Sequence, residues 1–221
     1  VMRRIEGQSL AEKLAHTRGL DERLALVPAL LRACQTVAFA HEHHIVHRDL
    51  KPQNVMLGAF GETYVLDWGL AVVEADAAAP DITTPHGSDG VVGTPAYMSP
   101  EQALGLAADA RSDVWGLGAC LYELLTGQPP ITGSSLQSAV SRAASSQVVR
   151  VRELEPNAPP ELVAICEKAL SAERSARYPN AEALARDLEG WLAGRTVSAH
   201  AYSRVELLKR ALQANRPAVV V

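Results

Sequence analysis

Four polar side chains in one short stretch have the types and spacing of a phosphoryl-transfer site. Asp49 and Lys51 stand two positions apart, Asn54 follows Pro52 closely, and Asp67 comes after two further apolar runs. An Asp can accept a hydroxyl proton, a Lys can neutralise a transferring phosphoryl group, and an Asn with an Asp can bind a hard cation. The stretch has no G-x-S-x-G and no Ser or Cys beside a His in a strained turn, so acyl transfer is not indicated.

A predicted helix and a predicted hairpin position these groups. From Pro28 onward the apolar residues recur at helical spacing, which predicts a helix that leads directly into the polar loop. Residues 55–57 and 63–66 are short β-type runs separated by glycines, which predicts a hairpin. The stretch from about 69 to 100 has no periodicity, and loops of this length are usually functional.

The rest of the pattern is mostly helical. Ser9 with Glu12 fits a capping box whose helix is expected to end near Gly19, and Ser203 with Glu206 fits another that opens a basic helix. Residues 113–126 are apolar on nearly every side, as in a helix buried within a bundle. Further helices are predicted at 135–146, 160–170 and 180–192. The expected fold class is therefore mainly α with one small β-hairpin.

Composition excludes several classes of function. The 221 residues are 48% hydrophobic with a net charge of −4, and Lys and Arg are scattered except near the C-terminal end, so a nucleic-acid partner is disfavoured. Cys34, Cys120 and Cys166 are far apart and lie in apolar surroundings. They are predicted to be buried thiols in a reducing, cytoplasmic compartment and not disulfides or a zinc site.

Four histidines near the polar loop raise the alternative of a metal cluster. They are His41, His43, His44 and His47, and the first and third can share a helix face. Because no fourth ligand is evident, surface or loop-anchoring roles are favoured over metal binding.

Four motifs, in order along the chain, carry a family resemblance. His47–Asn54 (H-R-D-L-K-P-Q-N) resembles the catalytic loop of eukaryotic-like (Hanks-type) bacterial serine/threonine protein kinases, and Asp67–Gly69 (D-W-G) stands where that family carries Asp-Phe-Gly. Gly93–Glu101 (G-T-P-A-Y-M-S-P-E) resembles the P+1 loop and its Ala-Pro-Glu, and Ser112–Trp115 resembles the start of the family's buried central helix. Four motifs in the family's order are a specific signal.

The resemblance implies ATP and Mg²⁺, or Mn²⁺ in its place, with Ser or Thr hydroxyls of proteins as acceptors. Asp49 would accept the proton of the hydroxyl, Lys51 would contact the γ-phosphate, and Thr94 would hydrogen-bond both residues. Asn54 and Asp67 would hold the metal ion. Lys51 with the Gly-Thr-Pro run favours Ser or Thr over Tyr as acceptor.

The family pattern also implies regulatory residues. Arg48 would receive a phosphate added to the loop between 69 and 100, where Thr83, Thr84 and Ser88 are the candidate sites. The alternative for each of the three is an ordinary solvated hydroxyl.

Three further residues would be structural. Glu101 and Arg177 match a pair that forms a buried ion bridge in the family, and Asp113 lies at the start of the central helix.

Residues 1–6 resemble the hinge between the two lobes of a kinase. Met2 would stand near the gatekeeper position, the backbone at Arg3 and Ile5 would meet adenine, and Met56 would form part of the adenine floor. Arg3 replaces an acidic residue common at the hinge, and Trp68 is bulkier than the usual Phe.

The resemblance divides the chain into segments. We expect a hinge remnant (1–6), a kinase C-terminal lobe (7–192) with the catalytic loop (44–54) and activation segment (67–101), a basic segment (193–217) and the start of a membrane run (218–221). The basic segment is either a solvated helix face or a cytoplasmic juxtamembrane segment, so that the domain would belong to a membrane-anchored kinase.

Two hypotheses follow. No G-x-G-x-x-G occurs, and Lys13 is the only Lys before the catalytic loop, so the N-terminal lobe is expected outside this sequence and the chain alone should be weak or inactive. The first hypothesis is an active Ser/Thr kinase, with a second copy as a candidate partner for trans-phosphorylation. The alternative is a pseudokinase or scaffold that binds proteins. Retention of all four polar residues of the loop and hairpin favours the enzyme.

Overall fold

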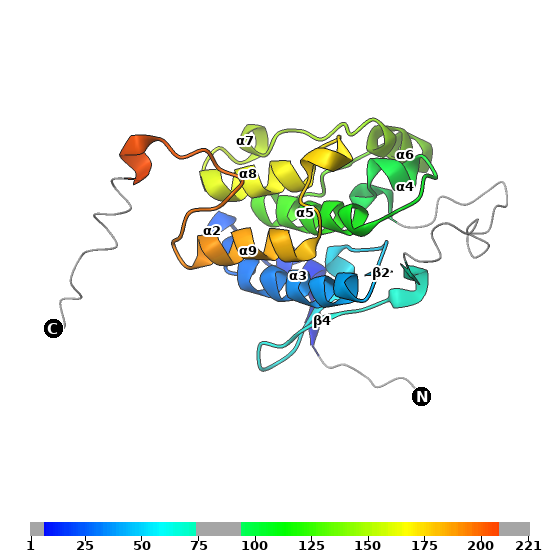
Figure 1. Cartoon of the computed structure of the whole chain (residues 1–221), viewed down its shortest axis with the longest axis horizontal. Coiled ribbons are helices and arrows are strands. Elements are labelled where there is room, and N and C mark those ends of the chain that lie inside the picture. The colour runs from blue at the N-terminus through cyan, green and yellow to red at the C-terminus, as the bar shows by residue number, and fades with distance from the viewer. Residues whose placement is uncertain (1–6, 74–93, 208–221) are drawn as a thin grey trace.

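A computed structural model of the chain describes residues 7–73 and 94–207, which form a mainly helical body with small sheets (Figure 1). The helices are α1 (Leu10–Ala15), α2 (Leu20–Leu24), α3 (Val27–Glu42), α4 (Pro100–Ala103), α5 (Ala110–Thr126), α6 (Leu136–Ala144), α7 (Val151–Leu154), α8 (Pro160–Ala169) and α9 (Ala181–Leu192). The mainly α prediction is confirmed, and so is each of the helices predicted from residue 113 to 192.

The β structure is larger than the single predicted hairpin. The hairpin of β3 (Val55–Leu57) and β4 (Thr63–Val65) is joined by β1 (Gln8–Ser9) in an antiparallel sheet of order β1-β3-β4. A second sheet pairs β2 (Ile45–Val46) with β5 (Val72–Val73). Strands of two residues carry no alternation of apolar and polar positions, so their pairing could not be read from the sequence.

The first capping box forms as predicted. The backbone N–H of Glu12 donates to Ser9 Oγ at 3.1 Å, and the N–H of Ser9 donates to Glu12 Oε2 at 2.7 Å. The helix ends at Ala15 with His16 as its C-cap, earlier than predicted, and a new helix begins at Leu20 with Gly19 as its N-cap. In the C-terminal part of the chain, Ser203 and Glu206 also exchange the hydrogen bonds of a capping box.

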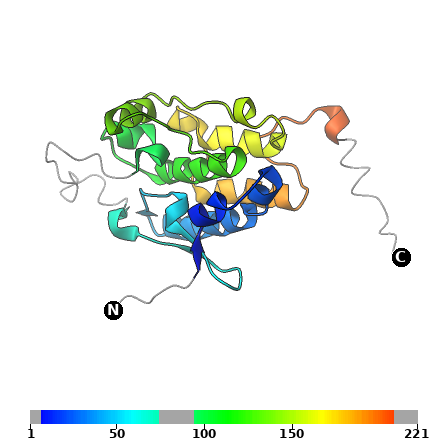
Figure 2. The same ribbon diagram turned by 180° about the vertical axis from the view of Figure 1, so that it is seen from behind.

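Helix α5 forms the centre of the core. It packs against α3, α8 and α9, and Trp115, Leu121 and Tyr122 are at most 1% exposed. Figures 1 and 2 show α9 lying along α3, with α5 and α8 stacked over them. Arg23 of α2 fixes the far end of α5, because its guanidinium donates to the carbonyls of Leu124 and Leu125 at 3.0 Å each.

The region Leu20–Glu42 is long and apolar enough to cross a membrane by length and composition alone. Here it forms α2 and α3, and Leu30, Ala33, Cys34 and Val37 of α3 are fully buried in the protein core. A core helix passes the same test, so this segment is weak evidence for a span.

Two glycines let α5 approach its neighbours closely. A Cβ at Gly116 would lie 2.8 Å from Cβ of Leu50, and a Cβ at Gly118 would lie 2.7 Å from Cβ of Ala169 in α8. Such distances are shorter than side chains tolerate, so a glycine at 116 allows the loop that carries Asp49 to rest directly on α5.

Candidate active site

Asp113, in the first turn of α5, holds the loop that follows β2. Its carboxylate accepts the backbone N–H of His47 at 2.7 Å, the N–H of Arg48 at 2.8 Å and Nε2 of His41 at 2.9 Å. Arg48 has a φ of 69°, a left-handed conformation that costs a non-glycine residue on the order of 1 kcal/mol. The buried carboxylate offsets this cost, because it satisfies two consecutive backbone donors.

His47 ties the loop to the hairpin. The fully buried ring contacts the carbonyl of Leu66 through Nε2 at 2.9 Å, and the backbone N–H of Asp49 donates to Nδ1 at 3.2 Å. A neutral imidazole with its proton on Nε2 satisfies both bonds. The ring of Trp68 packs on it, with ring centroids 4.5 Å apart. His47 therefore sets the distance between Asp49 and the residues that follow β4.

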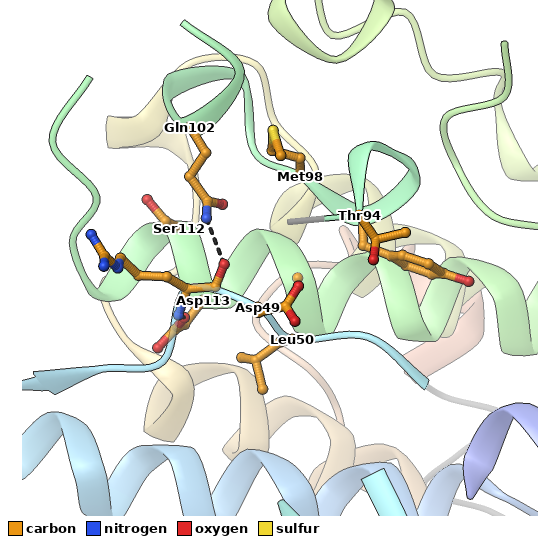
Figure 3. Close-up of a pocket in the computed structure, with 10 residues that line it drawn as sticks. Asp49, Leu50, Thr94, Met98, Gln102, Ser112 and Asp113 are labelled. Carbon is orange, nitrogen blue, oxygen red and sulfur yellow. Dashed lines mark hydrogen bonds between the residues drawn. The ribbon is translucent and has the colours of Figure 1, made fainter. Parts of the chain in front are cut away.

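Two predicted site residues contact the carboxylate of Asp49, and a third joins them through Lys51. Lys51 Nζ lies 2.6 Å and Asn54 Nδ2 lies 3.1 Å from Asp49 Oδ2, and Asn54 Nδ2 also donates to the carbonyl of Asp49 at 2.8 Å. Lys51 donates in addition to Thr94 Oγ1 at 3.1 Å, so a residue 43 positions away joins the group. Asp49 and Thr94 line one small hollow (Figure 3).

Thr94 is positioned by the tight turn that follows it. Tyr97 N–H donates to the carbonyl of Thr94 at 3.0 Å, and Tyr97 Oη donates to Glu123 of α5 at 2.6 Å. Burial and the contact with Glu123 raise the pKa of Tyr97, and burial raises the pKa of Glu123. The phenol therefore stays protonated and holds the turn on α5.

Asn54 and Asp67 lie at the same end of the hairpin. Val55 pairs with Val65, and the N–H of Leu66 donates to the carbonyl of Asn54 at 2.8 Å. Asp67 follows Leu66 directly, so it lies at the end of the hairpin where Asn54 lies. Asp67 adopts a left-handed conformation with φ 62° and ψ 62°. This bend ends the strand and begins the short turn of residues 68–70.

Glu101 and Arg177 form a buried, bidentate ion pair. Arg177 Nη1 lies 2.7 Å from Oε1 and Nη2 lies 3.0 Å from Oε2, while Ser112 Oγ donates to Oε1 at 2.7 Å. Burial opposes ionisation, but the hydrogen bonds from Arg177 and Ser112 and the charge of Arg177 outweigh it and lower the pKa of Glu101 to about 2. The guanidinium also stacks 4.9 Å from the ring centroid of Trp115.

Comparison with known sequences decides the family. The profile described as "Protein kinase domain" matches residues 1–188. The chain belongs to the protein kinase domain family. It is 37% identical over 188 residues to serine/threonine-protein kinase PknB of Mycolicibacterium smegmatis and 38% identical over 193 residues to PknB of Mycobacterium tuberculosis. Each alignment covers 85% of this chain and 29% of the relative.

A third relative shows the same relation. Serine/threonine-protein kinase PknD of Protochlamydia amoebophila is 38% identical over 218 residues, covering 87% of this chain and 22% of that protein. The chain therefore spans less than a third of the length of these relatives.

The kinase domain's predicted metal ligands fit a magnesium ion. Within the described residues the two side-chain hydrogen bonds of Asn54 both use Nδ2, which leaves Oδ1 as the oxygen to meet a cation. Within residues 7–73 and 94–207 no three or more His, Cys, Asp or Glu cluster as a metal site. Mg²⁺ suits such a sparse set, because it is commonly held by one or two protein oxygens together with phosphates and water.

The predicted adenine contacts of the kinase domain are only partly described. Met56 lies in β3, between Ser9 of β1 and Tyr64 of β4, and is partly exposed. Met2, Arg3 and Ile5 lie outside the described residues, so their roles stay predictions.

Arg48 contacts the start of the predicted activation segment and the residue that follows its end. Its Nε donates to the carbonyl of Leu70 at 2.5 Å, and Gln102 Nε2 donates to the carbonyl of Arg48 at 2.6 Å (Figure 3). The three candidate phosphorylation sites, Thr83, Thr84 and Ser88, lie outside the described residues, as do residues 218–221.

The sequence motifs did not predict the roles of two residues that hold the catalytic loop in place. Gln102, one position after the P+1 motif, contacts the catalytic loop, and His41 joins α3 to Asp113 with a side chain that is 4% exposed. The loop-anchoring reading of the histidines therefore suits His41 and His47, whereas His43 and His44 are exposed. Only the apolar positions around His41 could have indicated that it faces inward.

Proposed function

We propose that the described residues form the C-terminal lobe of an active serine/threonine protein kinase that transfers the γ-phosphoryl group of Mg-ATP to protein hydroxyls. The observation that carries the proposal is the convergence of Lys51, Asn54 and, through Lys51, Thr94 on the carboxylate of Asp49. Four residues from two distant segments are thus connected by hydrogen bonds, with Lys51 and Asn54 both on Asp49 Oδ2 and Thr94 on Lys51, an arrangement that a scaffold binding only proteins does not need.

The hydroxyl oxygen of the substrate bonds to the γ-phosphorus while the bond from that phosphorus to the leaving ADP breaks, and Asp49 accepts the proton of the hydroxyl. The 9% exposed carboxylate is held in place by Asn54, which fixes its rotamer through Nδ2. Lys51, hydrogen-bonded to Asp49 and Thr94, brings a positive charge to the transferring group. Asn54 Oδ1 and Asp67 would hold Mg²⁺, which supplies charge neutralisation at the phosphates.

A groove beside Thr94 suits a protein substrate. It has a volume of about 470 Å³ and is lined by the turn at 94–96, by α6 and by the preceding loop; its other lining residues are Pro129, Ile131, Thr132, Gly133, Ser135, Leu136 and Ala139. Thr94 belongs both to this groove and to the cluster around Asp49. A bound polypeptide would therefore place a Ser or Thr hydroxyl close to the proposed base.

The chain by itself should transfer phosphate weakly or not at all. Its sequence contains no G-x-G-x-x-G, and its only Lys before the catalytic loop is Lys13 in α1. The groups that cover and neutralise the nucleotide phosphates in this family must come from elsewhere. The three cysteines are buried and free, which suits a reducing, cytoplasmic setting.

The test compares this chain with the natural full-length protein, using radiolabelled ATP, Mg²⁺ and a peptide library with Ser, Thr or Tyr as acceptor. We expect transfer to Ser and Thr by the full-length protein and little by the chain alone. Nucleotide or protein binding without transfer by the full-length protein would overturn the proposal in favour of a pseudokinase.

A further inference from the structure

Residues 196–203, here named the strap, fold back onto α8 and α9. Val197 is 4% exposed and belongs to the protein core, and Ala199 and Tyr202 pack against that core. The phenol oxygen of Tyr202 accepts the N–H of Val197 at 3.0 Å, which closes the strap on itself. The match to the kinase family ends at residue 188, so the strap lies beyond the part of the chain that the family profile covers.

Asp187 of α9 holds the strap through its carboxylate. It accepts the N–H of Ser198 at 2.7 Å, the hydroxyl of Ser198 at 2.8 Å and the N–H of Ala199 at 3.0 Å. The fourth donor, Tyr178 Oη at 2.6 Å, comes from the domain itself. Three of four hydrogen bonds to a side chain that is only 7% exposed therefore come from the strap.

Residues of α8 and α9 around this carboxylate accommodate the strap. Lys168 of α8 lies 3.3 Å from Ser198 Oγ and sits over the ring of Tyr178, 4.2 Å from its centroid. A Cβ at Gly190 would lie 3.3 Å from the carbonyl of Thr196, so a glycine there leaves room for the strap backbone. Burial opposes ionisation of Asp187, but the four donors outweigh it and lower the pKa of this carboxyl.

The helix that carries Asp187 is also connected to the catalytic loop. At its other end, the N–H of Ala181 donates to Nδ1 of His41 at 3.2 Å. Nε2 of the same ring donates to Asp113, which accepts the N–H of Arg48 next to Asp49. Because α9 packs along α3 (Figures 1 and 2), a shift of α9 would change the contact between Ala181 and His41.

We propose that closure of the strap on Asp187 holds α9 in the position in which His41 supports Asp113 and the catalytic loop. Asp187 is then a positioning residue, and loss of its hydrogen bonds to the strap lowers the rate of phosphoryl transfer. This inference rests on the proposed kinase function for its effect on rate, but the strap and its coupling to the loop can be tested without activity.

The test uses Asp187→Asn in the full chain, with Glu182→Gln as control. The control also removes a negative charge from α9, but the side chain of Glu182 is 56% exposed and its ion pair with Arg186, at 3.8 Å, lies on the surface. Amide hydrogen exchange is followed at Ser198 and Ala199 for the strap, at Ala181 for α9 and at Arg48 for the loop. We expect exchange at least about tenfold faster at all four amides in Asp187→Asn and unchanged exchange in the control.

The same variants in the natural full-length protein give the functional readout. We expect kcat to fall with the KM for ATP unchanged, because the strap lies on α8 and α9 and changes only the position of the loop. Ser198→Ala, which removes one donor and no core atom, should give a smaller change of the same kind. Unchanged exchange at Ser198 and Ala199 would refute the role of Asp187 in holding the strap. Faster exchange there, with unchanged exchange at Ala181 and Arg48 and unchanged kcat, would refute the coupling of the strap to the catalytic loop. If the wild-type protein transfers no phosphate, the proposed function fails while the exchange data still decide the strap.

Discussion

The carboxylate of Asp113 accepts the backbone N–H of Arg48 at 2.8 Å, although 65 positions separate the two residues in the sequence. With the bond to the N–H of His47, this contact joins the central helix to the loop that carries the proposed base. The loop that carries the proposed base is thereby supported by a helix most of whose residues are buried.

Asp113→Ala should destabilise the fold and the loop together. The substitution leaves two backbone donors and His41 Nε2 without their acceptor, at a cost of about 2–4 kcal/mol in the free energy of unfolding. Urea unfolding followed by circular dichroism measures this cost. Asp113→Asn keeps the shape and one acceptor oxygen, so it should cost less; equal losses would argue against the hydrogen bonds as the cause.

Asp49→Asn should remove catalysis and spare binding. The amide has the shape of the carboxylate but cannot take a proton, so we expect kcat of the full-length protein to fall by at least about 10²-fold. Binding of Mg-nucleotide, measured by calorimetry, should change little. Asp21→Asn, at an exposed position of α2, is the matched control. Unchanged turnover would remove Asp49 from the role of base.

Much of this arrangement could be predicted from sequence, because local signals are strong where the elements are long or capped. The apolar run of α5, the spacing in α3 and the H-R-D-L-K-P-Q-N loop predicted both the bundle and the residues that meet at Asp49. The bond from Ala181 to His41 could not be predicted, because it joins positions 140 apart with no shared pattern. The same holds for the strap, since nothing in the sequence distinguishes Asp187, in the middle of α9, from an ordinary solvated residue.

Two glycines of α5 offer a matched pair of substitutions. Gly116→Ala would press on Leu50, the residue after Asp49, so we expect a fall in kcat of about 10- to 100-fold. Gly118→Ala would press on Ala169 of α8 instead and should cost about 1–3 kcal/mol of stability with kcat unchanged. Equal effects of the two substitutions on kcat would mean that the position of the loop does not depend on α5.

The ion pair between Glu101 and Arg177 should behave as a buried unit. Arg177→Met leaves the carboxylate of Glu101 without its main partner and should cost about 3–5 kcal/mol in the free energy of unfolding. The double variant with Glu101→Gln should cost less than the sum of the two single variants. A thermodynamic cycle from chemical denaturation measures the difference, and strict additivity would contradict the coupling.

The depressed pKa of Glu101 predicts acid sensitivity. Its folded value of about 2 lies below the ordinary value of 4.5, so the unfolded chain binds the proton more readily. The stabilisation amounts to about 3 kcal/mol in total; it is complete above about pH 4.5 and is lost as the pH falls through about 2. Glu101→Gln should flatten this part of the stability curve, whereas an unchanged slope would assign the acid transition to other carboxyls.

The pairing of β2 with β5 has a consequence for how the site survives motion. Ile45 pairs with Val73 and Val46 with Val72, so the chain enters and leaves the region of Asp49, Asn54 and Asp67 at one shared point. The pairing closes residues 45–73 into a loop of chain that contains Asp49, Asn54 and Asp67. Loss of the pairing would therefore free both ends of this loop of chain at once.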